Sequence, residues 1–208
     1  MIFSITCRCI NSVNKQDIIK CVKSIKTFHP DTRIVVVDSD SPDKSYFSEV
    51  EALGVIIADI KNKNYETGGI WHTFNNYTDD VYVFLQDSMV LNKSLSEYMG
   101  SDLRIINFYE GWKDGKPEEK AWSRQQMENT EYEYQESNFK MLQYNSFLAS
   151  RNTLIKLQAK KLDRILPTEK AHAQAMERIF GMALSQEGLM ENALLPANTI
   201  TKIWRQRK

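Results

Sequence analysis

Two acidic side chains follow strongly apolar segments of the sequence, and they are the first candidates for chemistry. Asp38 ends the run "RIVVVD", and Asp87 follows the run "VYVFLQ". A carboxylate in such a position can accept hydrogen bonds from a ribose hydroxyl, or it can initiate a turn. Cations such as Mg2+ and Mn2+ prefer oxygen ligands, and one carboxylate can suffice when phosphates and water complete the shell. Asp87 is therefore also a candidate metal ligand, although Gln86 and Ser88 flank it instead of a second acid.

Several other polar residues could contribute to a site. Gly68 and Gly69 could let a backbone approach a ligand, but the segment "NYETGGIWHTFNN" lacks the glycine spacing of phosphate-binding loops. His172 and Glu177 could each act as a base, as a metal ligand or as a solvated helix residue. They are separated by too many positions to share a tight helix face.

The composition predicts an ordinary globular domain. Of the 208 residues, 42% are hydrophobic and 26% are charged, which is enough to build a substantial core. The 27 basic residues balance the 27 acidic ones, so the overall charge gives no support for nucleic-acid binding. No apolar run approaches the roughly 20 residues of a membrane span, and "MIFSITCRCI" is typical of a strand and not of a signal peptide. We therefore expect a soluble, cytoplasmic protein.

The three cysteines give no sign of a metal site. Cys7, Cys9 and Cys21 lie close together in the sequence, and no second cysteine pair or nearby histidine completes a zinc-binding pattern. We expect them to be small buried residues of a protein in a reducing compartment.

The first ninety residues alternate between strand and helix patterns. Strands are expected at 2–7, 33–38, 55–60 and 80–85, and helices at 15–28, 46–53 and from an N-cap at Thr67. This order predicts βαβ units, and hence a largely parallel sheet that is covered by helices on both faces. Ligands bind beyond the carboxyl ends of such strands. The rule places Cys7–Arg8, Asp38–Asp40 and Gln86–Ser88 along one rim.

The second half of the chain has a different pattern. A strand is expected at 103–109, strand and helix patterns return at 140–157, and a strong helix is expected at 169–188 with Gly188 as its C-terminal stop. Between them, residues 110–137 are polar, charged and aromatic with little periodicity. They predict an irregular insert that carries specificity. Because no linker divides the chain, residues 1–208 are expected to form a single domain.

These features resemble the nucleotide-binding half of glycosyltransferases with the GT-A fold. The resemblance rests on the helix with "IIKCVKSI", the strand end "VVVDSDSPD", the polar helix start with its glycines, and the strand end "YVFLQDSMVL". It implies a mostly parallel α/β sheet with a nucleotide-sugar-binding half, 1–95, and an acceptor-side half, 96–208. The compact size is similar to that of virus-encoded members that glycosylate capsid protein, which would place the protein in a host cytoplasm.

The resemblance also implies substrates and site residues. The donor would be a nucleotide sugar, most often a UDP-sugar, and the enzyme would transfer a hexose or deoxyhexose to a glycan or glycoprotein. The implied donor contacts are Thr6, Cys7, Arg8, Asp38, Gly68, Gly69, Gln86, Asp87 and Ser88. Mn2+ or Mg2+ would be held by Asp87, helped by His172; alternatively Asp87 would bind the sugar and the metal would be weak or absent. The catalytic base would be Glu177 or Glu169. The insert would face the acceptor. The basic tail, with Lys202, Arg205, Arg207 and Lys208, would either close over the diphosphate or remain solvated.

Two other functions stay open at this point. A nucleotidyltransferase would have a glycine-rich loop with a basic residue after the first strand, but "CRCINSVNK" contains no glycine. A non-catalytic sugar-binding or assembly module is favoured by Gln86 and Ser88, because the family's Asp-x-Asp motif would carry a further acid beside Asp87.

Overall fold

The protein is built around one six-stranded sheet. The computed structural model describes residues 1–112 and 115–203. The spatial order of the strands is β3 (Ile56–Ala58), β2 (Arg33–Asp38), β1 (Ile2–Cys7), β4 (Val81–Gln86), β9 (Phe147–Ser150) and β6 (Leu103–Ile105). The first four are parallel to one another, whereas β9 runs antiparallel to both β4 and β6. The predicted α/β class with a mostly parallel sheet is confirmed, and both halves of the chain supply strands.

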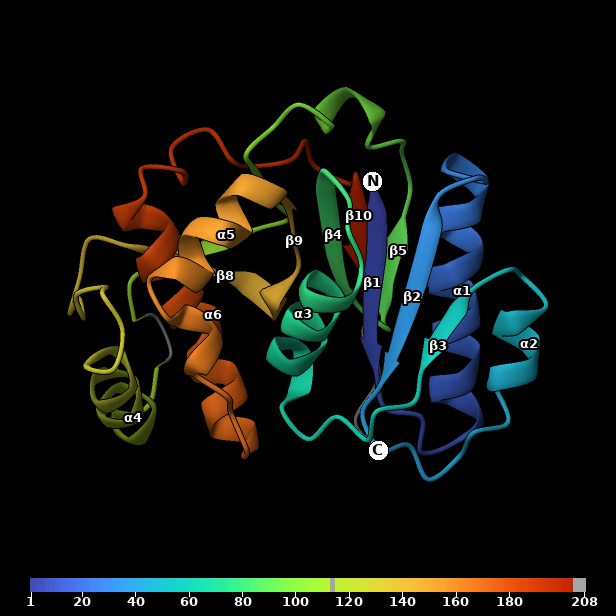
Figure 1. Ribbon diagram of the computed structural model, residues 1–208, viewed down its shortest axis with the longest axis horizontal. Helices are drawn as coiled ribbons and strands as arrows, with labels where there is room; N and C mark the ends of the chain where they lie inside the picture. The colour runs from blue at the N-terminus through green and yellow to red at the C-terminus, as the bar shows by residue number, and fades with distance from the viewer. Residues whose placement is uncertain (113–114, 204–208) are drawn as a thin grey trace.

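Helices cover both faces of this sheet (Figure 1). Alternate residues of β1 explain the layering: Ile2 belongs to the core on one face, and Phe3 and Ile5 belong to the core on the other. The layer packed on Phe3 and Ile5 consists of α1 (Ser12–Phe28) and α2 (Phe47–Glu51). The layer packed on Ile2 consists of α3 (Tyr65–Asn76), α5 (Arg151–Ala159) and α6 (Lys170–Gln186).

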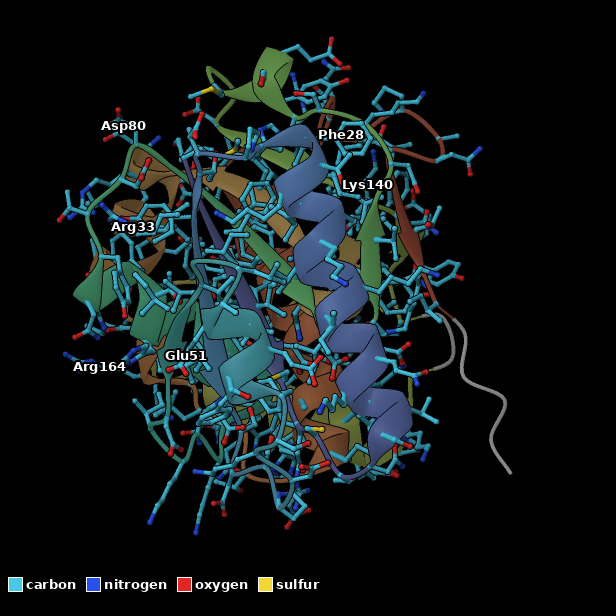
Figure 2. All side chains as sticks on the ribbon, turned by 90° about the vertical axis from the view of Figure 1, so that its right-hand side faces the viewer. Phe28, Arg33, Glu51, Asp80, Lys140 and Arg164 are labelled. Carbon is cyan, nitrogen blue, oxygen red and sulfur yellow. The ribbon has the colours of Figure 1, made fainter. Side chains whose placement is uncertain are left out.

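Figure 2 looks onto the face that α1 covers. Phe28, at the end of α1, and Asp80, just before β4, lie at the same end of the molecule. The carboxyl end of β4 therefore lies at the opposite end. The Asn11 side chain caps α1 by accepting hydrogen bonds from the N–H groups of Val13 and Asn14, so the helix begins earlier than its apolar pattern predicts.

Two short antiparallel pairs extend the core. β5 (Met89–Leu91) pairs with β10 (Ile200–Lys202), and β7 (Phe108–Glu110) pairs with β8 (Lys140–Leu142). The short 3-10 helices are η1 (Ser96–Tyr98), η2 (Gln143–Asn145) and η3 (Leu162–Arg164). The pairing with β5 brings β10, from the far end of the described chain, to the strand that follows β4.

Two boundary predictions were wrong. Thr67 does not cap α3, because the helix begins at Tyr65 and Thr67 is buried within it. The preceding turn is organised by Asn62, which accepts a hydrogen bond from the N–H of Asn64 and donates one to the carbonyl of Tyr65. The strand predicted at 103–109 is divided into β6 and β7, which belong to different sheets.

The predicted irregular insert contains a helix, α4 (Pro117–Met127). Proline in the first turn and two acidic residues there favour a helix start. The helix has little apolar periodicity because it docks partly through charge: Glu119 forms a buried ion pair of 3.1 Å with Arg178 of α6. The structure therefore corrects the prediction that this segment is irregular throughout.

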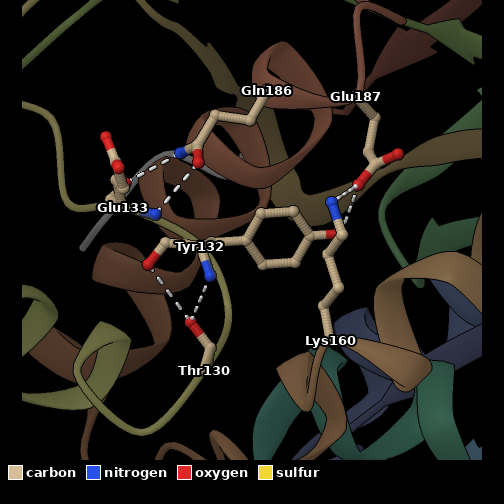
Figure 3. A network of polar contacts seen from close by, with 6 residues as sticks. All are labelled: Thr130, Tyr132, Glu133, Lys160, Gln186 and Glu187. Atoms are coloured by element: carbon tan, nitrogen blue, oxygen red, sulfur yellow. Dashed lines mark hydrogen bonds and ion pairs between the residues drawn. The ribbon is translucent and has the colours of Figure 1, made fainter.

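A polar network fixes the loop after α4 (Figure 3). The Tyr132 hydroxyl donates a 3.0 Å hydrogen bond to Glu187, whose carboxylate also forms a 2.6 Å ion pair with Lys160. Gln186 and Glu133 exchange two further hydrogen bonds. The insert is thus attached to the ends of both α5 and α6.

Among the described residues, no helix combines the length and the apolar character that a membrane span requires.

Candidate functional site

A cavity of about 770 Å³ opens at the carboxyl ends of β1, β2 and β4, and we call it the rim cavity. Its strand-end lining consists of Thr6, Cys7, Arg8, Ser39, Asp40, Gln86, Asp87 and Ser88. Its other walls come from the turn before α3, the residues around the start of α6, and β10. The structure thus brings together all of the predicted donor residues except Asp38, Gly68 and Gly69.

The rim cavity has many charged side chains of both signs. Four cationic residues line it: Arg8, Lys63, Lys170 and Lys202. Three acidic residues face them: Asp40, Glu66 and Asp87. Lysine and arginine side chains at short range favour a ligand with several negative charges, such as a diphosphate. The acids are available to hold hydroxyl groups or a cation.

Gln86 joins three elements at the floor of this cavity. Its Nε2 donates a 2.8 Å hydrogen bond to Glu66 of α3, and its Oε1 accepts one from Lys202 of β10. The Lys202 amine also lies 4.1 Å from the centre of the Tyr144 ring. Because both ends of the amide are engaged, Gln86 holds the charged groups of Glu66 and Lys202 in place.

Two carboxyl groups have raised pKa values: Glu66, which lines the rim cavity, and Glu177 of α6, which is not among its lining residues but interacts electrostatically with Glu66. Burial is the main reason that the Glu66 pKa is raised, and the negative charge of Asp87 adds to it. Burial and then the charge of Glu66 raise the pKa of Glu177 to about 8, although Arg178 and a hydrogen bond from the Tyr144 backbone N–H act in the opposite sense. Such a carboxyl group can exchange a proton near neutral pH.

Asp38 does not line the cavity. Its fully buried carboxylate accepts hydrogen bonds from the Ser41 N–H, at 2.9 Å, and from the Tyr46 hydroxyl, at 2.8 Å. Asp38 therefore initiates the turn after β2, which was one of its two predicted roles. The acid that reaches the cavity from this strand is the exposed Asp40, whose φ of 57° places it in the left-handed region.

The two glycines of α3 serve packing within the protein. A Cβ atom on Gly69 would lie 1.9 Å from the Thr6 hydroxyl oxygen, and one on Gly68 would lie 2.0 Å from the side-chain oxygen of Asn62. The helix can approach β1 and the preceding turn only because these positions carry no side chain. This packing accounts for both glycines without a ligand, and their predicted contact with the donor stays a prediction.

The structure does not place His172 and Glu169 where the sequence suggested. The His172 ring stacks on Trp122 of α4, with ring centres 4.3 Å apart and planes 6° apart, and it does not line the rim cavity. Glu169 is exposed just before α6. Among the described residues, no three His, Cys, Asp or Glu side chains form a group that could hold a metal ion. The predicted partnership of His172 with Asp87 is therefore not supported.

Three cavity residues had no distinct signal in the sequence. Lys63, Glu66 and Lys170 lie in polar segments where charged residues are ordinary, and only the fold shows that they face one cavity. Lys202 was noted as part of a basic tail, but its role depends on the pairing of β10 with β5. The tail residues Arg205, Arg207 and Lys208 lie outside the described residues.

The cysteines and the start of the chain have structural roles. Cys7, Cys9 and Cys21 are buried, as predicted, and burial is the main cause of their raised pKa values. The terminal amine of Met1 forms an ion pair with Asp79, at the end of the sheet opposite the rim cavity.

Comparison with known proteins identifies the fold. No protein-family model and no curated protein sequence matches the chain. Among solved structures, one similar protein is an active-site mutant of the galactosyltransferase LgtC. The alignment covers 100% of this chain and 89% of the LgtC chain, with a TM-score of 0.55 and 12% sequence identity. Another is glucosyl-3-phosphoglycerate synthase from Mycobacterium tuberculosis, in complex with Mn2+, UDP and phosphoglyceric acid. The alignment covers 99% of this chain and 72% of the synthase chain, with a TM-score of 0.53 and 17% sequence identity.

A third neighbour is a fragment of TarS from S. aureus. The alignment covers 87% of this chain and 56% of the TarS fragment, with a TM-score of 0.51 and 16% sequence identity. These comparisons give no support to a viral origin, which stays a prediction. At such low identity the likeness concerns the fold alone. The chain has the GT-A fold of glycosyltransferases, with the rim cavity at the carboxyl ends of its parallel strands.

Proposed function

We propose that the chain is a glycosyltransferase that moves a hexose or deoxyhexose from a UDP-sugar to a glycan or glycoprotein. The observation that carries this proposal is the rim cavity, because it lies where α/β sheets bind ligands and contains both cations and acids. The GT-A fold supports the same conclusion. One neighbour with this fold is described in complex with UDP and Mn2+, and a TarS fragment is described in complex with UDP.

The donor nucleotide is proposed to lie along the strand ends. Thr6 lies near the end of β1 and Arg8 follows that strand, and Asp40 replaces Asp38 as the acid available to a ribose hydroxyl or to the base. The diphosphate would meet Lys202 and Lys170, which line the cavity from β10 and from the start of α6. Lysine provides a compact positive charge that neutralises phosphate oxygens without demanding one orientation.

A divalent cation fits this cavity only with help from the substrate. Asp87 lines the cavity, but Gln86 is engaged at both ends of its amide and His172 stacks on Trp122. Asp87 would hold Mn2+ or Mg2+ together with phosphate oxygens and water. The cation would supply Lewis-acid stabilisation of the leaving diphosphate. We therefore expect weak cation affinity until the nucleotide is bound.

Glu177 is the proposed base. In the transfer, the acceptor oxygen forms a bond to the anomeric carbon of the sugar while the bond from that carbon to the diphosphate oxygen breaks. The electron pair leaves with the diphosphate, and the hydroxyl proton passes to the ionised Glu177 carboxylate. Because the pKa of Glu177 is raised to about 8, the carboxylate that this step needs becomes more populated as the pH rises through that value. The exposed Glu169 is the weaker of the two predicted candidates.

A thermal-shift panel tests this function. UDP should raise the melting temperature, GDP and ADP should raise it less, and Mn2+ should increase the UDP effect because ligands that bind only the native state stabilise it. Asp87→Ala should remove the increase due to Mn2+, whereas Asp80→Ala, at the opposite end of β4, should retain it. If no nucleotide changes the melting temperature, both enzyme readings fail and a non-catalytic sugar-binding module is favoured.

A further inference from the structure

A second cavity, of about 460 Å³, shares Lys202 with the rim cavity. Asn107 lines it from the connection between β6 and β7, and Tyr109 lines it from β7 itself. Gln143 and Tyr144 line it from η2. Aliphatic residues from the segment 194–200 complete its wall. We call it the tyrosine cavity. Its volume falls within the roughly 300–1,000 Å³ typical of small-molecule sites.

A buried amide in its wall lacks a hydrogen-bond donor. Gln143 is only 7% exposed, and among the described residues its Oε1 atom has no hydrogen-bond partner. Leaving a buried acceptor unpaired costs about 1–3 kcal/mol. Gln143 lines the tyrosine cavity, so a small rotation of its side chain would let a ligand donate a hydrogen bond to Oε1 and remove this cost.

The neighbouring tyrosine is held in an uncommon backbone conformation. Tyr144 has a φ of 64°, and the next residue, Asn145, has a φ of 46°. Such left-handed conformations of residues other than glycine cost on the order of 1–3 kcal/mol and persist where the surroundings enforce them. Here the Tyr144 N–H bonds the Glu177 carboxylate, and the Asn145 amide donates to the Ala173 carbonyl. Both contacts are with α6.

This conformation places Tyr144 between the two cavities. Its ring lies against the Lys202 amine, which lines both of them, and its backbone holds Glu177. Glu177 in turn lies within electrostatic range of Glu66, which lines the rim cavity. The proposed base is therefore connected to one cavity through Tyr144 and to the other through Glu66.

The lining of the tyrosine cavity matches an uncharged ligand that is rich in hydroxyl groups. Tyr109 and Tyr144 present aromatic rings and hydroxyl groups, Asn107 and Gln143 present amides, and the remaining residues apart from Lys202 are aliphatic. Sugar rings combine apolar faces with hydroxyl groups that donate and accept hydrogen bonds, so this lining suits them. A diphosphate is better matched by the rim cavity, which contains four cationic residues.

We propose that the tyrosine cavity is the acceptor site and that it binds a neutral carbohydrate, with Gln143 accepting a hydrogen bond from one of its hydroxyl groups. This inference rests on the proposed function, because an acceptor site requires a transferase. It also moves the acceptor away from the insert at 110–137, which was predicted to face it, to the segments 106–109, 143–144 and 194–202.

Saturation-transfer NMR with lactose, maltose and cellobiose tests the proposal. At least one disaccharide should receive saturation from the unmodified protein. Gln143→Leu and Tyr109→Ala should each weaken its binding at least about tenfold, as the loss of one hydrogen bond to a buried group predicts. The matched controls Gln158→Leu and Tyr77→Ala lie outside both cavities and should bind normally.

The UDP-dependent rise in melting temperature is measured in the same variants. It should be retained in all of them, which also shows that each variant folds. The acceptor proposal is overturned if none of the three disaccharides binds, or if binding is unchanged in both Gln143→Leu and Tyr109→Ala. Loss of the UDP response in the unmodified protein would instead contradict the proposed function, and the two failures are thereby distinguished.

Discussion

Replacing Glu177 by Gln should change how the stability of the protein depends on pH. The pKa of this carboxyl group rises from its ordinary value of 4.5 to about 8 on folding, mainly through burial and secondly through Glu66. Between these two values the native state holds a proton that the unfolded state has lost. The contribution of Glu177 to the free energy of unfolding is therefore fully present below pH 4.5, and it is lost as the pH rises through 8.

The size of the effect follows from the difference between the unfolded pKa of 4.5 and the folded pKa of about 8. Each pH unit between these values lowers the free energy of unfolding by about 1.4 kcal/mol, so the total decrease should be about 5 kcal/mol. This is an upper limit, because Glu177 keeps partial access to solvent. Glutamine has nearly the same shape but does not ionise. Glu177→Gln should therefore be more stable than the unmodified protein at pH 9, by up to the same amount.

Urea denaturation between pH 5 and 9, followed by tryptophan fluorescence, measures this difference. The control is Glu169→Gln, since Glu169 is exposed just before the same helix and should leave the profile unchanged. His29 and His72, whose pKa values are lowered by burial, titrate in all of these proteins and cancel in the comparison. A profile for Glu177→Gln that parallels the unmodified one would refute the reasoning.

If Glu177 is also the base, the rate of transfer should rise with pH through about 8.

Three further changes test separate parts of the structure. Gly69→Ala should destabilise the protein by about 1–3 kcal/mol because the new Cβ atom would meet the Thr6 side chain. In urea denaturation, adding Thr6→Ala should recover part of this loss. Stabilisation by Gly69→Ala alone would contradict the packing argument. Glu119→Gln should cost up to about 3–5 kcal/mol because it removes the carboxylate that faces the buried Arg178 guanidinium. The control is Glu136→Gln, because Glu136 belongs to the exposed ion pair with Arg124. Equal unfolding energies for the two variants would contradict the role assigned to Glu119. Lys202→Ala should weaken UDP binding in calorimetry with and without Mn2+, whereas an unchanged affinity would remove Lys202 from the donor site.

The parallel sheet and its rim were predictable because they depend on local patterns. A continuous β-branched run such as residues 33–38 has few alternatives to a buried strand, and helices between such runs impose a parallel order. The chain order alone then brings Arg8 and Asp87 to the same edge. No knowledge of side-chain contacts is needed for that step.

The roles of individual side chains were less predictable because they depend on contacts between distant segments. Asp38 and Asp40 look equivalent in sequence, but the Tyr46 hydroxyl and the turn after β2 take up Asp38 and leave Asp40 at the cavity. Gly69 is needed because of Thr6, which is far away in the sequence and adjacent only across the β1–α3 contact. The helix α4 escaped prediction because a buried ion pair stabilises its docking where periodic apolar residues usually would.

The position of β10 has a consequence for the order in which the protein folds. The contact between Lys202 and Gln86 joins residues 116 positions apart, whereas β1 and β2 can pair across the short connection formed by α1. Contacts between distant positions require the ordering of a long loop and generally form after local ones. We therefore expect the sheet to assemble first, and the wall that Lys202 contributes to both cavities to be completed late. A polypeptide that has folded its sheet is then not yet competent to bind its ligands.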